Sequence, residues 1–404
     1  ASSHLRKIVR KTHAADLAAV FQTLSPAHQQ RLFETIESRE QKGVVLSELD
    51  RDTFLDLVED LDLDELVRIL ETMPNDDVTD LIGQLPEARS SAVLEKMKKE
   101  HSAQVEGLLS YRDDTAGGIM VTDFIALRED CTAREAIASL QKEYQDVEMP
   151  FYLYAVDESG RLVGVSSLRQ LVLVPPETPL KAFMTRDVFS VQTDMDQEEV
   201  AKVVARYDIL AVPVVDDSHR LVGIVTVDDV IDIFRAEATE DMLKMAGVGD
   251  EFIETKSIYK STRMRLPWLF ASCFGGIVAF YVINHFEPSL TRFAYLAAFI
   301  PVIMGMGGNI GTQSSTIVVR GLATGRLMVR DLRKVVFKEL VIGGVLGVFY
   351  GLLIGGVAQA RYGRLSFALA VSLAVLSSMA IAALVGSLVP MLFARLNIDP
   401  AVAT

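Results

Sequence analysis

Four long stretches in the last third of this chain contain no Asp, Glu, Lys or Arg. They are 21 to 30 residues long and cover residues 266–286, 293–319, 340–360 and 365–394. About 20 apolar residues are enough to cross a bilayer as an α-helix. The sequence therefore predicts an α-helical transmembrane bundle over residues 263–404, with four spans.

Charge separates this membrane part from the rest of the chain. Residues 263–404 carry 4 acidic and 12 basic side chains, whereas residues 1–262 carry 50 acidic and 28 basic ones. A strongly acidic surface lacks the clustered Lys and Arg that bind phosphates, so we expect no nucleic-acid partner. The excess of carboxylates suits cations, although any single Asp or Glu can equally serve only as a solvated surface group.

The loops between the predicted spans give the orientation. The loops expected outside the cytosol contain only Arg292, Arg361 and Arg364. On the other side lie Lys260, Arg263, Arg265, Arg320, Arg326, Arg330, Arg333, Lys334 and Lys338. By the positive-inside rule, residues 1–262 lie in the cytosol of a multi-pass membrane protein. We expect no signal peptide, and no disulfide between Cys131 and Cys273.

The soluble half divides into three predicted parts. Apolar residues at helical spacing over residues 1–118 predict an acidic, all-α superhelical domain. In residues 119–240, Val156–Val165 aligns with Val215–Ile224 at an offset of 59 residues, which indicates an internal duplication. Each copy alternates helices and strands, an α/β pattern. Residues 241–262 predict a stiff connecting helix that reaches the membrane without a flexible linker.

The duplication resembles a tandem pair of cystathionine-β-synthase (CBS) domains, with copies at residues 119–182 and 183–240. Such modules often bind adenine nucleotides or ions and regulate an attached channel or enzyme.

The second span is unusually polar for a membrane helix. It contains Pro301–Thr316, in which Asn309 and Gln313 are four residues apart and so share one helix face. Polar side chains in hydrocarbon need partners or water, so this face should line a wet path or another helix. Helix packing through small residues is the alternative for the glycines of the same run.

The order of these parts, together with Pro301–Thr316 and Asn397–Ala401, resembles the MgtE family of Mg²⁺ channels. The resemblance implies a homodimer with one pore at its axis and five membrane helices per subunit. The fifth helix would begin near Asp399 and continue into a segment that bears the main pore carboxylate. The pore carboxylate therefore has no residue number in this sequence. We expect that a chain truncated at Thr404 does not conduct ions normally.

The resemblance also implies Mg²⁺-binding residues in the cytosolic part. They are carboxylates, with two backbone carbonyls at Gly118 and Ala205. Mapped onto this sequence, the ligands are Asp76, Asp80, Gly118, Ala205, Asp208, Asp229, Asp232, Glu237, Glu240 and Asp241, with Asp399 at the pore entrance. Oxygen ligands of this kind are those that Mg²⁺ prefers, and like charges would repel until the ion binds.

The resulting hypothesis is a Mg²⁺ channel or transporter that cytosolic Mg²⁺ closes. Two alternatives remain: a broader transporter of Co²⁺, Mn²⁺ or Ni²⁺, and a membrane-anchored CBS sensor without transport. An enzyme is not expected, because no zinc-protease, nucleophile-elbow or phosphate-loop motif occurs. ATP is a possible second ligand of the CBS pair, but the family's Arg-Asp pair is replaced by Arg169-Gln170.

Overall fold

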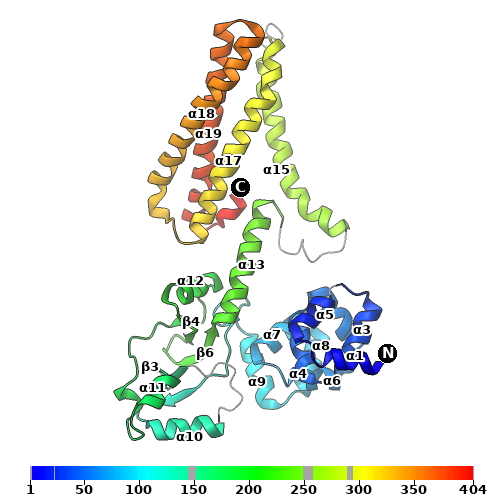
Figure 1. The fold of residues 1–404 in the computed structure, drawn as a ribbon, viewed down its shortest axis with the longest axis vertical. Helices are drawn as coiled ribbons and strands as arrows, with labels where there is room; N and C mark the ends of the chain where they lie inside the picture. The colour runs from blue at the N-terminus through cyan, green and yellow to red at the C-terminus, as the bar shows by residue number, and fades with distance from the viewer. Residues whose placement is uncertain (1, 22, 144–151, 249–257, 289–293, 404) are drawn as a thin grey trace. The chain divides into compact units, whose positions relative to one another are not determined.

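The computed structural model describes residues 2–21, 23–143, 152–248, 258–288 and 294–403, which form two compact units (Figure 1). The first unit is Ala1–Glu237 and contains the helical N-terminal part and both copies of the duplication. The second unit is Ala238–Thr404 and contains the membrane helices.

Short helices build the N-terminal part of the first unit. Ser38 and Asp50 cap two of them, since their side chains accept hydrogen bonds from the backbone of Gln41 and Thr53. The apolar faces meet in one core that includes Phe21 and Phe54, both fully buried. The helices are α1 (Ser2–Val9), α2 (Ala14–Phe21), α3 (Pro26–Thr35), α4 (Arg39–Ser47), α5 (Arg51–Glu59), α6 (Leu63–Leu70), α7 (Asn75–Gln84), α8 (Glu87–Lys96) and α9 (Lys99–Leu108).

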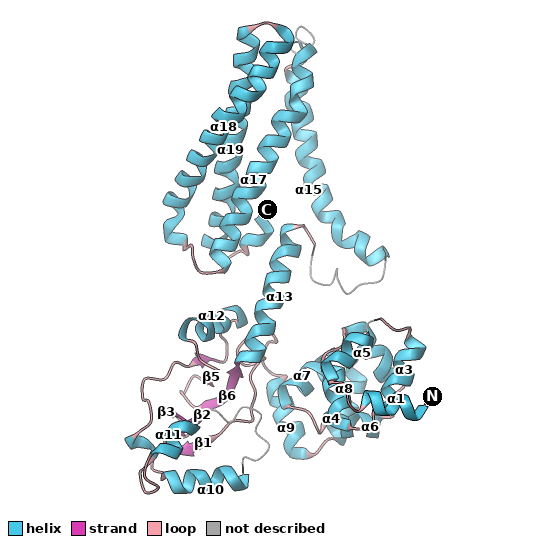
Figure 2. Ribbon diagram, viewed as in Figure 1, coloured by secondary structure: helices cyan, strands magenta, loops and turns pink. Residues whose placement is uncertain are grey.

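Each copy of the duplication forms a three-stranded sheet with helices against it (Figure 2). In both sheets the first strand is parallel to the second, and the second is antiparallel to the third. The first copy contains β1 (Ala126–Arg128), α10 (Ala133–Glu143), β2 (Tyr152–Val156), β3 (Leu162–Ser167), α11 (Leu168–Leu173) and the 3₁₀ helix η1 (Leu180–Ala182). The second contains β4 (Val191–Gln192), α12 (Gln197–Tyr207), β5 (Ala211–Val215), β6 (Leu221–Thr226) and α13 (Val227–Met245).

The two copies exchange the segments that lead into them. Val121, which precedes β1, forms a β-bridge with Ile224 of the second copy, and Thr185, which follows η1, forms a β-bridge with Val165 of the first copy. Ala116 lies in the core of the second copy. The segment between the helical part and the CBS pair therefore packs in the core of the second copy. A domain boundary at residue 118 falls inside this segment.

The repeated Leu-Val-Gly motif needs its glycine in both copies. A Cβ added at Gly164 would lie 2.4 Å from Sδ of Met184, and one added at Gly223 would lie 2.5 Å from Sδ of Met120. Met120 belongs to the segment before β1, and Met184 belongs to the segment after η1; each segment covers one of the sheets. The sequence repeat thus reflects a repeated close contact and not only a repeated strand pattern.

The predicted connecting helix at residues 241–262 is divided in the structure. Helix α13 ends at Met245, Gly247 has a φ of +73°, and α15 begins at Ile258. Residues 249–257 lie outside the described residues. The left-handed glycine ends α13, as glycine commonly does after a helix, so a single continuous helix is not formed there.

Four helices among the described residues are long and apolar enough to cross a membrane, as predicted. The predicted start of the second span at residue 293 lies outside the described residues. The spans cover Ile258–His285, Tyr295–Ala323, Val329–Tyr362 and Leu365–Arg395. They are formed by α15 (Ile258–His285), η2 (Ala294–Phe299) with α17 (Ile300–Ala323), η3 (Val329–Asp331) with α18 (Leu332–Tyr362), and α19 (Leu365–Arg395), which η4 (Pro400–Ala403) follows.

Small residues allow α18 and α19 to pack closely. Buried glycines recur every four residues along α18, and Gly351 lies so close to α19 that an added Cβ would be 2.7 Å from the carbonyl oxygen of Ser372. The Ser372 hydroxyl donates to the Gly351 carbonyl at 2.8 Å. Such contacts are typical of membrane helices, where small residues and hydroxyls hold helices together.

Candidate metal centre

Three of the predicted Mg²⁺ ligands come together in the first unit. Asp76 and Asp80 lie one turn apart on α7, and Asp229 lies in the first turn of α13. The buried Asn75 fixes the start of α7, because its amide donates to Gln104 on α9 at 3.2 Å and to Thr122 at 3.1 Å. We call Asp76, Asp80 and Asp229 the acidic cluster.

The electrostatics of the acidic cluster disfavour its negative charge. Burial, followed by the charges of Asp77 and Asp229, raises the pKa of Asp76 to about 8. Removal of neighbouring water, followed by the charges of Asp77, Asp113 and Asp229, raises the pKa of Asp80 to about 6, although the residue itself is exposed at the surface. The carboxylates of α7 therefore repel the carboxylate of Asp229 on α13.

Asp229 keeps one local partner in this cluster. The Thr226 hydroxyl donates to Asp229 Oδ2 at 2.5 Å, but burial outweighs this bond and raises the pKa of Asp229 to about 6. Hydroxyl donors supply no positive charge, so the bond does not remove the repulsion from the other carboxylates.

One oxygen atom of Asp76 is evidence for a cation site at the acidic cluster. Its Oδ1 is buried and has no hydrogen-bond partner, which is costly for a carboxylate. No group of three His, Cys, Asp or Glu side chains among the described residues already has metal-ligand geometry. One or two direct carboxylates with retained water suit Mg²⁺, so the cluster fits a hydrated ion better than a fully ligated one.

A second pair of predicted ligands meets in the second unit through a lysine. The Lys244 amine donates to Asp399 Oδ2 at 2.6 Å and also pairs with Glu240 one turn earlier on α13. Burial favours the neutral amine, but the hydrogen bonds to Asp399 and Glu240 outweigh it and raise the pKa of Lys244. Lys244 thus already supplies one positive charge to two carboxylates that the resemblance assigns to Mg²⁺.

The remaining predicted ligands are not gathered into one place. Asp208 ends α12 in the left-handed conformation with φ of 51°, three residues after Ala205. Asp232 pairs with Arg235 at 3.3 Å and is exposed, and Glu237 accepts a hydrogen bond from Gln197 at 2.8 Å. Asp241 lies half-buried on α13, and Gly118 lies so near the Arg112 carbonyl that only glycine fits.

Four participants were absent from the sequence-based set. Asp77, Asp113 and Asp228 act on the acidic cluster, and Lys244 joins Glu240 to Asp399. The spacing of Glu240 and Lys244 is the usual one for a helical ion pair and could have indicated the pair. Nothing in the local sequence indicates that Asp113 approaches Asp80, because that contact depends on the fold.

The polar face of α17 is uncovered by the described residues. Asn309, Thr312, Gln313 and Thr316 recur at helical spacing and are all exposed. Ser315 lines a groove of about 560 Å³ between α17 and α19, and its buried hydroxyl has no hydrogen-bond partner. In a membrane such a face must contact water or another polypeptide.

A separate cavity of about 360 Å³ lies in the first CBS copy. Tyr152 and Arg169 line it, together with Gln170. The Gln170 side chain accepts hydrogen bonds from Ser167 N at 3.1 Å and Ser166 Oγ at 3.2 Å, which completes the cap of α11. Gln170 therefore stabilises the start of α11.

Sequence comparison now identifies the family. The chain is 39% identical to the magnesium transporter MgtE of Thermus thermophilus over 304 residues, which cover 75% of this chain and 67% of that protein. It is 33% identical to the magnesium transporter MgtE of Bacillus subtilis over 311 residues, covering 77% and 69%. This chain belongs to the MgtE family.

Family models match four segments of this MgtE-family chain. Residues 12–114 match the MgtE intracellular N domain, residues 116–177 and 180–236 match CBS domains, and residues 300–404 match the MgtE divalent cation transporter domain. The predicted family, fold class and multi-pass membrane location are thereby confirmed.

A solved structure supports the arrangement of the cytosolic part. The crystal structure of the cytosolic domain of the Mg²⁺ channel MgtE in complex with ATP aligns with a TM-score of 0.54 and 36% identity, covering 56% of this MgtE-family chain and 93% of that one. The two relatives and the solved structure described above are named as transporters and as a channel.

Proposed function

We propose that this MgtE-family chain transports Mg²⁺ across the inner membrane as a homodimer, and that cytosolic Mg²⁺ closes it by binding to the N-domain, CBS and connecting-helix carboxylates. The observation that carries the proposal is the acidic cluster, in which burial and mutual repulsion leave Asp76 with an unpartnered oxygen.

The membrane part supports transport over simple anchoring. An anchor has no need for the exposed amide and hydroxyl groups of Asn309, Thr312 and Gln313 within a membrane span. A path for a hydrated ion, formed where a second copy faces the first, gives these groups both water and protein partners.

The acidic cluster supports closure by the transported ion. Two like charges at close range oppose one another by roughly 1–4 kcal/mol, depending on the local dielectric. A divalent cation reverses the sign of this interaction, so Mg²⁺ holds α7 against α13, whereas its loss favours separation. Oxygen ligands also accept Mn²⁺ or Co²⁺, which are the competing substrates to test.

The experiment measures Mg²⁺ uptake by the protein at its natural full length, at controlled internal Mg²⁺, in cells that lack other Mg²⁺ importers. The triple variant Asp76→Asn, Asp80→Asn, Asp229→Asn should remain active at internal Mg²⁺ that closes the original protein. Asp217→Asn, in an exposed turn, is the matched control and should close normally. Closure of the triple variant at unchanged Mg²⁺ would show that the cluster does not sense the ion.

ATP is the second ligand to test, at the cavity of the first CBS copy. The ATP complex of the related cytosolic domain and the presence of Tyr152 and Arg169 support it, whereas the use of Gln170 in the helix cap weakens it. Calorimetric titration with ATP should show weak binding that Arg169→Ala abolishes; Gln170→Asp should strengthen it. Tight ATP binding that neither substitution alters would mean that the nucleotide binds at another site.

A further inference from the structure

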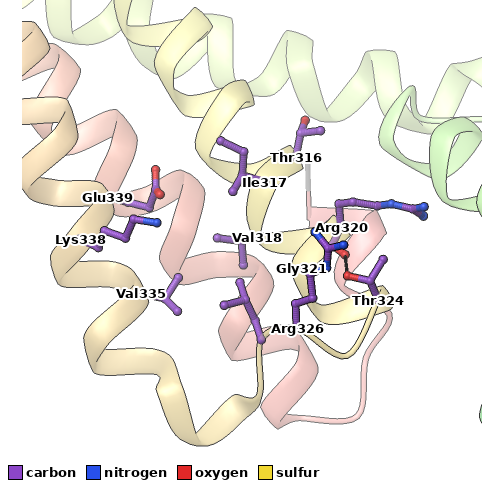
Figure 3. A pocket seen from close by; sticks show the side chains of 11 residues that line it. Thr316, Ile317, Val318, Arg320, Gly321, Thr324, Arg326, Val335, Lys338 and Glu339 are labelled. Atoms are coloured by element: carbon purple, nitrogen blue, oxygen red, sulfur yellow. Dashed lines mark hydrogen bonds between the residues drawn. The ribbon is translucent and has the colours of Figure 1, made fainter. Parts of the chain in front are cut away.

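A cavity of about 690 Å³ opens between α17, the loop that follows it and the first turns of α18 (Figure 3). None of the residues predicted to bind Mg²⁺ lines it. Its wall combines apolar side chains with three cations and a single carboxylate. The charged residues are Arg320, Arg326, Lys338 and Glu339.

The three cations of this cavity are available to a ligand. Arg320, Arg326 and Lys338 are all exposed, and none forms an ion pair with a described carboxylate. In Figure 3, Lys338 extends from α18 toward α17, and Arg326 comes from the connecting loop. Three unneutralised cations around one cavity favour an anion that carries several acceptor oxygens, such as a phosphate.

The cavity lies where a lipid headgroup would be. It is at the end of α17 and α18 at which Lys and Arg concentrate, and this is the cytosolic end by the positive-inside rule. Ile317, 58% exposed, continues the same wall up the membrane span and offers an apolar surface to an acyl chain. Basic cavities between membrane helices on this side are suited to anionic headgroups.

Glu339 limits how deep the anion can go. It is 4% exposed, and its Oε2 accepts a hydrogen bond from the Ser314 hydroxyl at 2.9 Å. No Lys or Arg nitrogen of the described residues lies within ion-pair distance of it. When ionised, Glu339 repels a phosphate from the inner end of the cavity, so the phosphate stays near Arg320 and Arg326.

We propose that this cavity binds the phosphate of an anionic phospholipid of the cytosolic leaflet. Arg320, Arg326 and Lys338 hold the phosphate oxygens, and an acyl chain follows the face of α17 that contains Ile317. The site goes beyond the proposed function, because it requires neither Mg²⁺ sensing nor transport.

Native mass spectrometry of the full chain in detergent tests the site. Phosphatidylglycerol should bind at least about tenfold more tightly than phosphatidylcholine with the same acyl chains. The triple variant Arg320→Gln, Arg326→Gln, Lys338→Gln should lose this preference. Arg330→Gln, Arg333→Gln, Lys334→Gln removes the same charge from the same side of the membrane outside the cavity, and should keep it.

Three outcomes overturn the proposal. Equal binding of the two lipids removes the anionic preference, and equal losses in both triple variants indicate a diffuse basic surface. Displacement of phosphatidylglycerol by inorganic phosphate at similar concentration indicates a free-anion site. Thermal melting checks that the variants fold. If the cavity triple variant is unfolded, the single variants Arg326→Gln and Arg330→Gln are compared instead. Only Arg326→Gln is then expected to lose the preference for phosphatidylglycerol.

Discussion

Removing the charge of Asp76 should stabilise the metal-free protein. Burial and the neighbouring carboxylates raise the pKa of Asp76 from its ordinary value of 3.8 to about 8. The folded state therefore holds a proton on Asp76 that the unfolded chain has released, and stability falls as pH rises through this window. Asp76→Asn keeps the size of the side chain and abolishes this dependence.

The size of the effect follows from the pKa difference. Each pKa unit corresponds to about 1.4 kcal/mol, so keeping the proton on Asp76 lowers the free energy of unfolding by roughly 4 kcal/mol at pH 7 and by under about 2 kcal/mol at pH 5. The gain from Asp76→Asn should thus grow by about 2–3 kcal/mol between these two pH values. Above pH 8, where the folded state is also ionised, the gain should become constant.

Hydrogen–deuterium exchange of the full chain in EDTA measures this gain in stability. The backbone amides of α7 should exchange more slowly in Asp76→Asn than in the original protein. Asp217→Asn, in an exposed turn, is the control and should leave α7 unchanged at both pH values. Added Mg²⁺ should reverse the order, since it stabilises the original protein more than a variant that has lost a ligand. A gain that is equal at pH 5 and pH 7, or a loss of protection at pH 7, would refute the electrostatic reasoning.

Two further predictions concern the second unit. Lys244→Met removes the positive charge between Glu240 and Asp399. A disulfide engineered between α13 and η4 should therefore form more slowly in EDTA, and added Mg²⁺ should restore its rate of formation. An unchanged rate in EDTA would contradict the bridging role of Lys244. Gly351→Leu should lower the melting temperature in detergent, because a Cβ would meet the Ser372 carbonyl at 2.7 Å and overpacking costs about 1–3 kcal/mol. Gly356→Leu, where nothing lies within 4 Å, should be tolerated, and equal losses would contradict the packing.

Periodic features of the sequence were the ones that predicted structure well. The four membrane spans follow from the repeated long stretches without charged residues, and the duplicated CBS pattern follows from self-alignment; both are confirmed. The i, i+4 spacing of Asp76 and Asp80 likewise fixes them to one face of α7. The exchange of Val121 and Thr185 between the two copies could not be predicted, because it joins residues far apart in sequence through a few backbone bonds.

The connecting helix shows why a helical pattern alone overextends an element. Charged and apolar residues continue at helical spacing through residues 241–262, but Gly247 adopts the left-handed conformation just after Met245. A single glycine was given too little weight against the surrounding pattern. The site residues that depend on tertiary contact, such as Asp113 beside Asp80, have no local signal to find.

The two acidic groups differ in what already neutralises them, and this difference predicts which one controls the response to Mg²⁺. Glu240 and Asp399 share Lys244, so their approach needs no metal, whereas the charges that act on Asp76 come from other carboxylates. Asp76→Asn should therefore change the Mg²⁺ concentration that half-protects the chain from protease more than Glu240→Gln does. A larger shift from Glu240→Gln would mean that the lysine-bridged group, and not the acidic cluster, sets the sensitivity to Mg²⁺.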